Sequence, residues 1–132
     1  MKSTLFPLLA LGLLAVATMQ IPATGSEAKP AAKQLRHMVM FGFKDSSSEA
    51  DVQGVVDAFK KLPSEIPSIV AFEHGLNNSP EGLNDGLTHC FLLTFADEAG
   101  RAEYLPHPAH KAFGKTLKPH LEKVVVVDYW AE

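Results

Sequence analysis

The sequence predicts an α+β fold in which one four-stranded antiparallel sheet carries its helices on one face. The first observation is a set of four short apolar segments that are typical of strands, at residues 35–43, 69–76, 87–95 and 123–130. The second is the helical spacing of apolar residues between the first two segments, with a further helical region between the last two. The resulting order, β-α-β-β-α-β, is the ferredoxin-like split β-α-β arrangement.

The first part of the 132-residue chain has the features of a secretory leader. Lys2 gives a short basic start, an apolar run covers residues 5–19, and residues 23–25 offer small side chains to a signal peptidase. Residues 15–17 are a second candidate cleavage site. The apolar run is short for a membrane span, and an uncleaved anchor is the alternative interpretation. We therefore predict a signal peptide over residues 1–25.

Cleavage would leave a flexible tether, rich in alanine, lysine and proline, over residues 26–34 and one domain over residues 35–130. We expect an exported protein, periplasmic or extracellular, with no membrane attachment after cleavage. The whole chain has a formal net charge of −3, and the leader's only charged residue is Lys2. This mild acidity argues against nucleic-acid binders, which concentrate positive charge. The single cysteine, Cys90, cannot form an internal disulfide and is interpreted as a small hydrophobic residue.

The first helix is predicted from its cap, its apolar spacing and its end. Ser48 and Asp51 have the spacing of a capping box, and the acidic residue is well placed in the first turn. Apolar residues then recur at helical spacing and form one stripe: Val52, Val55, Val56, Phe59 and Leu62. Pro63 is expected to end the helix, because proline interrupts the hydrogen bonds of a helix interior.

The middle of the chain predicts two strands joined by a long loop. The second strand covers residues 69–76, with Gly75 as a candidate bulge. Residues 77–86 are rich in asparagine, aspartate and glycine, which indicates the loop. The third strand then covers residues 87–95.

The second helical region is predicted to be split in two. Asp97 is placed to cap a short helix that runs through Tyr104. The bend at residues 106–108 follows, and a further helix runs from Pro108 to about Lys118, because proline is favoured at the first helical position. The last strand covers residues 123–130.

The strands are apolar on both faces, which predicts a dimer. Residues 38–41, 91–93 and 124–127 do not alternate apolar with polar side chains, as strands with one wet face do. Helices would cover only one face of the sheet, and a soluble monomer rarely exposes the large apolar patch that remains. We therefore expect a homodimer in which two sheets pack face to face into one barrel-like core.

Tyr104, His107 and His110 gather at the reversal between the two short helices. The spacing His107-x-x-His110 places both imidazoles on one side of a helical turn. In one interpretation this is a helix start at which the histidines bind backbone groups. In the other, Tyr104 and His110 face a pocket, where an imidazole transfers protons near neutral pH and a phenol donates to an oxyanion. No metal site is indicated, because the two histidines lack a clear third ligand.

Two further histidines, His37 and His89, lie near the starts of the first and third strands. They either bond to backbone groups at the strand ends or line the same pocket as His110. The sequence alone leaves both interpretations open.

Several of these segments together resemble a known family, the stress-responsive A/B barrel domain (Dabb) proteins of the dimeric α+β barrel superfamily. The matching pieces lie between residues 35 and 130: Arg36-His37-Met38-Val39, Gly86-Leu87-Thr88-His89, His107-Pro108-Ala109-His110 with Phe113-Gly114, and Val126-Val127-Asp128-Tyr129. The resemblance implies a ferredoxin-like protomer, a dimer, and a pocket between the sheet and the helices.

The resemblance also suggests roles for individual residues. A plant polyketide cyclase of this family closes its product by aldol condensation without cofactor or metal, and its catalytic tyrosine and histidine match Tyr104 and His110. Its pocket histidines match His37 and His89. Arg36 stands where that enzyme has lysine.

Three hypotheses about function follow. The first is a dimeric protein of unassigned activity that binds a small, mostly apolar molecule near Tyr104 and His110, with His37, His89 and His107 as ligand-binding residues. The alternative is a cofactor-independent cyclase or lyase, with His110 as general base and Tyr104 as oxyanion donor. The third is a purely assembling or protective role. No cofactor is expected, because the sequence has no nucleophile motif and no phosphate-binding loop.

Overall fold

The structure is a computed structural model that describes residues 32–132. The predicted leader over residues 1–25, and the tether up to residue 31, lie outside the described residues. The described elements are β1 (Leu35–Phe43), α1 (Glu49–Glu65), β2 (Ala71–Leu76), β3 (His89–Phe95), α2 (Glu98–Tyr104), α3 (Pro108–Leu117) and β4 (Leu121–Trp130). Within residues 32–132, no helix is long and apolar enough to cross a membrane.

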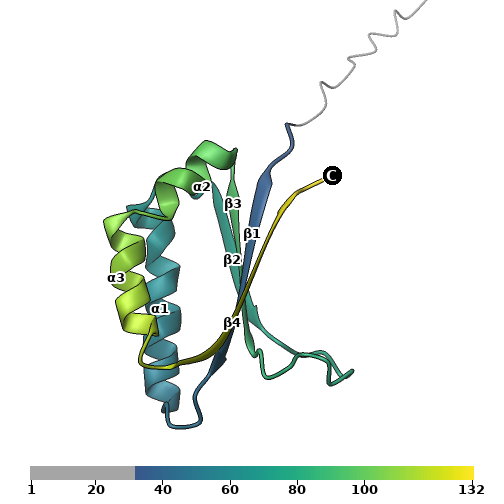
Figure 1. Cartoon of the computed structure of the whole chain (residues 1–132), viewed down its shortest axis with the longest axis vertical. Helices are drawn as coiled ribbons and strands as arrows, with labels where there is room; N and C mark the ends of the chain where they lie inside the picture. The colour runs from purple at the N-terminus through teal and green to yellow at the C-terminus, as the bar shows by residue number, and fades with distance from the viewer. Residues whose placement is uncertain (1–31) are drawn as a thin grey trace, which may run out of the picture. The chain divides into compact units, whose positions relative to one another are not determined.

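The four strands form one antiparallel sheet in the order β2-β3-β1-β4, and all three helices lie on one side of it (Figure 1). The predicted α+β fold with split β-α-β order is therefore confirmed. The core lies between the sheet and the helices and is strongly aromatic. The ring of Phe59 on α1 lies 4.4 Å from that of Phe91 on β3 and 4.5 Å from that of Phe113 on α3. Burial of each such side chain contributes about 1.5–3 kcal/mol.

Helix α1 begins as predicted but ends later. The Asp51 N–H donates to Ser48 Oγ at 3.1 Å, and the Ser48 N–H donates to Asp51 Oδ2 at 2.9 Å, so the capping box is complete. The prediction that Pro63 ends the helix is wrong, because the helix continues to Glu65. Pro63 lies in the last turn, where the Ile66 N–H still donates to the Leu62 carbonyl at 2.8 Å beyond it. The burial of both Leu62 and Ile66 favours this extra turn.

The strands differ from the prediction mainly at their ends. β2 and β3 each begin two residues later than expected and β4 begins two residues earlier. Gly75 is not a bulge, because β2 and β3 pair without interruption. The irregularity lies instead between Gly42 and Phe43, where β1 pairs with β4. A Cβ at Gly42 would lie 2.6 Å from the Gly86 carbonyl oxygen, so this close approach of two backbones requires glycine.

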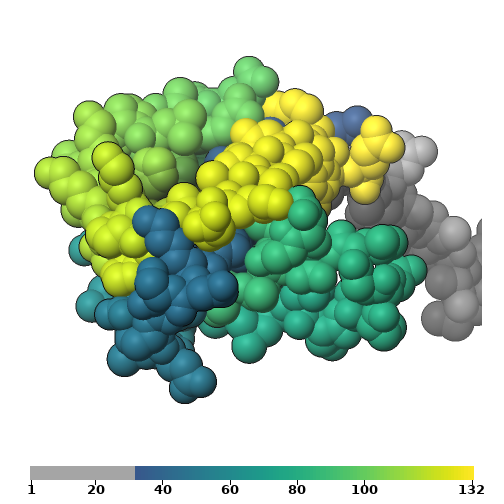
Figure 2. Space-filling model, turned by 60° about the horizontal axis from the view of Figure 1, so that its bottom comes forward, coloured from purple at the N-terminus to yellow at the C-terminus, as the bar shows by residue number. Residues whose placement is uncertain are grey.

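The face of the sheet away from the helices is apolar. Strand register places Met38 beside Leu92 and Val127, and places Met40 beside Cys90. No helix among the described residues covers these side chains (Figure 1). Because side chains alternate along a strand, Val125 and Val127 belong to this open face, whereas Val124 and Val126 lie on the helix side. Strand β4 is an edge strand, and Figure 2 shows it in yellow along the surface beside the helical region.

Candidate functional site

A cavity of about 220 Å³ lies between the sheet and helices α2 and α3. Its polar side chains are His37 on β1, Tyr104 on α2 and His110 on α3. Its remaining walls are almost entirely apolar and come from α1, α3, the turn after α2 and strands β1 and β4: Val39, Phe41, Phe59, Leu105, Phe113, Gly114, Leu117 and Val126. The cavity therefore combines apolar walls with two imidazoles and one phenol.

The turn between α2 and α3 positions His110. His107 caps α3, since its Nδ1 accepts the Ala109 N–H at 3.1 Å, and Pro108 occupies the first turn. His110 follows in that turn, and its Nδ1 lies 2.9 Å from the Leu105 carbonyl oxygen. A carbonyl oxygen can only accept, so Nδ1 must carry the hydrogen. In the neutral ring, Nε2 then holds the lone pair and is the atom that can accept a proton.

Tyr104 lies between the two cavity histidines. Its ring centroid is 4.2 Å from that of His110 and 5.6 Å from that of His37. Burial raises the pKa of Tyr104, so the phenol stays protonated and acts as a hydrogen-bond donor. No hydrogen bond links its hydroxyl to another described residue, His110 included. Within residues 32–132, Ser68 Oγ is the fully buried side-chain atom that lacks a hydrogen-bond partner. The Tyr104 hydroxyl also lacks a partner but is not among the fully buried atoms. It is therefore not sealed and is available to a ligand.

His37 is held by a partner on β4. The Nδ1 atom of His37 lies 2.6 Å from Asp128 Oδ1, and Arg101 Nη1 lies 2.6 Å from Asp128 Oδ2. Burial would raise the pKa of Asp128, but the hydrogen bonds and charges of Arg101 and His37 outweigh burial and lower it. Asp128 is therefore ionised at neutral pH. An ionised carboxylate accepts only, so His37 Nδ1 donates to it and Nε2 is the remaining ring nitrogen.

Two of the five residues predicted for the site do not line this cavity. His107 acts as the cap of α3. His89 pairs with Phe41, toward the end of β1 that is farther from His37, and its ring lies 4.9 Å edge-on from that of Phe43. Burial, followed by the nearby His74, lowers the pKa of His89. The structure thus brings together Tyr104, His110 and His37, and places His89 and His107 elsewhere.

Sequence reasoning missed Asp128 and Arg101 as members of the site. The available signals were an acidic residue in the otherwise apolar last strand, and an arginine three residues before Tyr104 on the same helix. Within residues 32–132, no group of three or more histidine, cysteine, aspartate or glutamate side chains is arranged to hold a metal ion.

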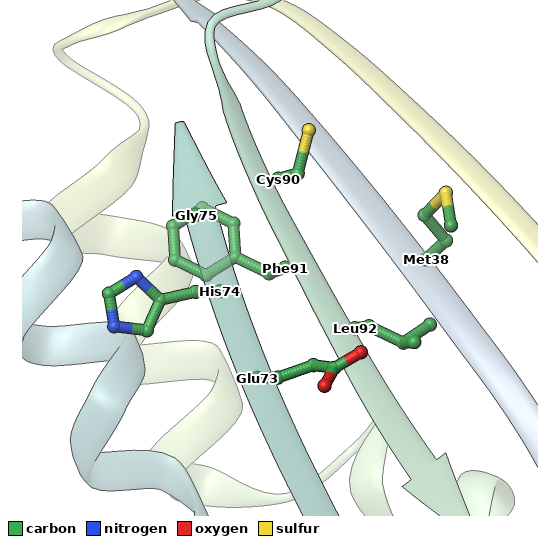
Figure 3. A pocket seen from close by; sticks show the side chains of 7 residues that line it. All are labelled: Met38, Glu73, His74, Gly75, Cys90, Phe91 and Leu92. Carbon is green, nitrogen blue, oxygen red and sulfur yellow. The ribbon is translucent and has the colours of Figure 1, made fainter. Parts of the chain in front are cut away.

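A second hollow, of about 300 Å³, lies over strands β1, β2 and β3 (Figure 3). Met38, Cys90, Leu92 and Glu73 contribute side chains from the open face of the sheet, and the backbone of Gly75 leaves room between them. Its lining contains one charged residue, Glu73, and one histidine, His74. It does not combine two histidines with a tyrosine, as the helix-side cavity does. This hollow belongs to the open apolar face.

Comparison with known proteins supports the family resemblance and the fold. A sequence profile of the stress responsive A/B barrel domain matches residues 35–131. The stress-response A/B barrel domain-containing protein HS1 of Arabidopsis thaliana is 35% identical over 95 residues, which cover 72% of this chain and 87% of that protein. Olivetolic acid cyclase of Cannabis sativa is 27% identical over 95 residues, covering 72% of this chain and 94% of the cyclase.

Solved structures agree with the fold. A hydroxynitrile lyase from Passiflora edulis superposes with a TM-score of 0.72 at 25% identity, over 76% of this chain and 95% of the lyase. A dimeric protein of ferredoxin-like fold and unknown function from Bacteroides fragilis superposes with a TM-score of 0.61 at 28% identity, over 74% of this chain and 96% of that one. The profile match covers nearly all of the described domain, and the chain therefore belongs to the stress-responsive A/B barrel domain family.

Proposed function

We propose that this protein binds a small, mostly apolar molecule that carries an oxygen atom, in the cavity formed by His37, Tyr104 and His110. The observation that supports this most directly is the Tyr104 hydroxyl, a donor of the cavity lining that is not sealed from solvent and has no hydrogen-bond partner in the described part of the chain. A carbonyl or phenolic oxygen of a ligand would supply that partner. Because burial keeps this phenol protonated, it would donate to the ligand oxygen, and this bond would favour binding.

The cavity favours a neutral ligand of limited size. Its volume of about 220 Å³ is below the range typical of drug-sized ligands. No lysine or arginine lines it, so a carboxylate would lose its hydration without a cationic partner. Leu105 and Val126 line the cavity and are 49% and 52% exposed, which gives it an apolar mouth. We therefore propose small aromatic or aliphatic aldehydes, ketones and phenols as ligands.

Binding of benzaldehyde, cyclohexanone and phenol, measured by calorimetry with benzoate as the charged comparison, tests this proposal. We expect the neutral probes to bind and benzoate to bind at least about tenfold more weakly. Tyr104→Phe should weaken binding by about 5–100-fold, as loss of one hydrogen bond of about 1–3 kcal/mol implies. The chain has two tyrosines, and Tyr129→Phe on the open face is the matched control. No binding of any neutral probe, or equal effects of the two substitutions, would contradict the proposal.

A second candidate function is catalysis by proton transfer without a cofactor. The favouring observation is that both cavity imidazoles use Nδ1 in a fixed hydrogen bond, which leaves both Nε2 atoms for a substrate. His110 Nε2 would remove a proton from a carbon next to a carbonyl, and Tyr104 would donate to the oxygen that becomes negative. The resulting enolate would attack a second carbonyl carbon, and protonated His110 would return its proton to the new alkoxide.

Two relatives make this chemistry a reasonable candidate, since one is named a cyclase and another a hydroxynitrile lyase. Deuterium exchange next to the carbonyl of cyclohexanone, and release of cyanide from a cyanohydrin, are the direct assays. We expect His110→Gln to lower either rate by about 100-fold or more. His107→Ala serves as the control, because it removes only the cap of α3 and should lower stability by about 1 kcal/mol. Rates that are unchanged in His110→Gln would leave His110 with a structural role.

We also propose that the protein is exported and works as a homodimer. The open apolar face of the sheet and the dimeric neighbours of the same fold support the homodimer. The apolar run at residues 5–19 and the small residues at 23–25 support export. Intact-mass analysis of secreted protein should show a chain that begins near Ser26, and a full-length soluble chain would contradict export.

A further inference from the structure

Three side chains from three elements form one continuous series of polar contacts that ends at the cavity. Arg101 on α2 lies 2.6 Å from Asp128 on β4, and Asp128 lies 2.6 Å from His37 on β1. His37 is 6% exposed and lines the cavity, whereas the side chains of Arg101 and Asp128 are each about a quarter exposed. Charge at the partly exposed end can therefore influence the buried imidazole.

The two oxygens of Asp128 have separate partners. Oδ1 accepts from His37 and Oδ2 accepts from Arg101, so rotation of the carboxylate would break at least one bond. Arg101 therefore fixes the orientation of the Asp128 carboxylate. The carboxylate in turn fixes the tautomer of His37, in which Nδ1 carries the hydrogen and Nε2 is the free ring nitrogen.

Arg101 also constrains the helix that carries Tyr104. The two residues are three positions apart on α2 and lie on the same side of that helix. The ion pair to β4 therefore fixes the helix face that places Tyr104 against the cavity. One contact thus positions two of the three polar groups of the site.

Other charged groups near His37 are few. Tyr104 and His110 face it across the cavity, and the wall contributed by α1 is Phe59. Phe95 on β3 packs at 6.2 Å between ring centroids. Glu98 lies 4.0 Å from Arg101, but its side chain is 69% exposed, so solvent screens its charge. Arg101 and Asp128 are therefore the charges that dominate the surroundings of His37.

We propose that Arg101 is a positioning residue of the cavity, which holds Asp128 so that His37 keeps its hydrogen on Nδ1 and offers Nε2 to the ligand. The assignment of a ligand rests on the proposed function, but the contacts of Arg101 with Asp128 and His37 do not. Arg101 itself does not line the cavity.

The test is an NMR measurement of the His37 ring nitrogens in the full chain, because their chemical shifts report which nitrogen carries the hydrogen, with substitutions that separate charge from hydrogen bonding. Arg101→Gln keeps a donor but removes the charge, and we expect His37 to lose its single Nδ1–H form and to populate both tautomers. Arg101→Lys restores the charge and should return the ring-nitrogen shifts to those of the parent. Lys111→Gln, an exposed cation on α3, is the control and should leave these shifts unchanged. Equal ring-nitrogen shifts in the parent and in Arg101→Gln would overturn the proposal.

A measurement on the unsubstituted protein covers the case in which Arg101→Gln does not fold. The carboxyl carbon of Asp128 should titrate below the ordinary value of 3.8, and titration at or above that value would also overturn the proposal. Calorimetry with benzaldehyde distinguishes the two proposals. Absence of binding together with the expected NMR results would contradict the proposed function and retain the role of Arg101.

Discussion

Two valines on strand β4 provide a matched test of the open sheet face. Val124 and Val127 are each 46% exposed in the single chain, but strand register places Val127 on the open face and Val124 on the helix side. An aspartate at either position replaces a side chain of equal exposed fraction in the monomer. If two sheets pack face to face, only Val127→Asp introduces a carboxylate into the interface.

The expected size of the effect follows from this exposure. Full burial of a valine side chain contributes about 1.5–3 kcal/mol. With 46% of Val127 still to be buried in the dimer, each copy would lose about 1 kcal/mol. Burial of the new carboxylate adds at least about 2 kcal/mol per copy. Two copies together give about 6 kcal/mol, which corresponds to a dimer dissociation constant more than about ten-thousandfold weaker, at about 1.4 kcal/mol per tenfold.

Light scattering and sedimentation across a range of concentrations would measure this change. We expect Val124→Asp to remain dimeric, and Val127→Asp to give a monomer or an unfolded chain. Circular dichroism separates those two results, and both agree with the reasoning. A fully dimeric Val127→Asp, or equal loss of dimer in the two variants, would refute the sheet-to-sheet interface.

Three further predictions concern stability. Asp128 has a lowered pKa in the folded protein, so it stabilises the fold above the ordinary carboxyl range and this contribution disappears as pH falls through the lowered pKa. Asp128→Asn should therefore destabilise by about 1–3 kcal/mol at pH 7 and by progressively less as pH falls below the ordinary carboxyl value of 3.8, as denaturant unfolding across this range would show, and a pH-independent difference would contradict it. Ser48→Ala should lower the free energy of unfolding by about 1 kcal/mol and the Tm by about 4–8 °C, whereas an unchanged Tm would mean that the capping box is not needed. Gly42→Ala should destabilise by about 1–3 kcal/mol in denaturant unfolding because its Cβ would meet the opposite backbone, whereas Gly54→Ala in α1 meets nothing within 4 Å and should be neutral or stabilising; similar results for the two would argue against the close approach.

Local patterns predicted the elements well where neighbours along the chain decide the structure. The apolar stripe and capping box of α1 and the bounds of β1 depend on contacts within a few residues, and both agree with the structure. The end of α1 does not, because the burial of Leu62 and Ile66 outweighs the helix-breaking tendency of Pro63. The bulge lies at Gly42 instead of Gly75, at the position where Gly86 of a distant loop approaches the strand, which is a contact that local sequence does not reveal.

The candidate site likewise has one part that local sequence determines and another that depends on distant contacts. Tyr104 and His110 are brought together by one bend, so their proximity was predictable from spacing. The sequence could not show which histidine of the pair His107 and His110 would be used as the cap. His37 reaches the cavity only because β1 lies beside β4 and pairs His37 with Asp128, and this register is set by the whole sheet.

The alternation of side chains along β1 assigns its two faces to different tasks. His37, Val39 and Phe41 line the cavity, whereas Met38 and Met40 belong to the open face. A slip of one residue would exchange the two sets, so one register must satisfy both the site and the apolar face. The bulge after Gly42 lies beyond the last of these residues and leaves their alternation intact. Substitutions at cavity positions can therefore alter the chemistry of the site while the open face stays the same. This separation accounts physically for a single fold that includes proteins named as a cyclase and as a lyase.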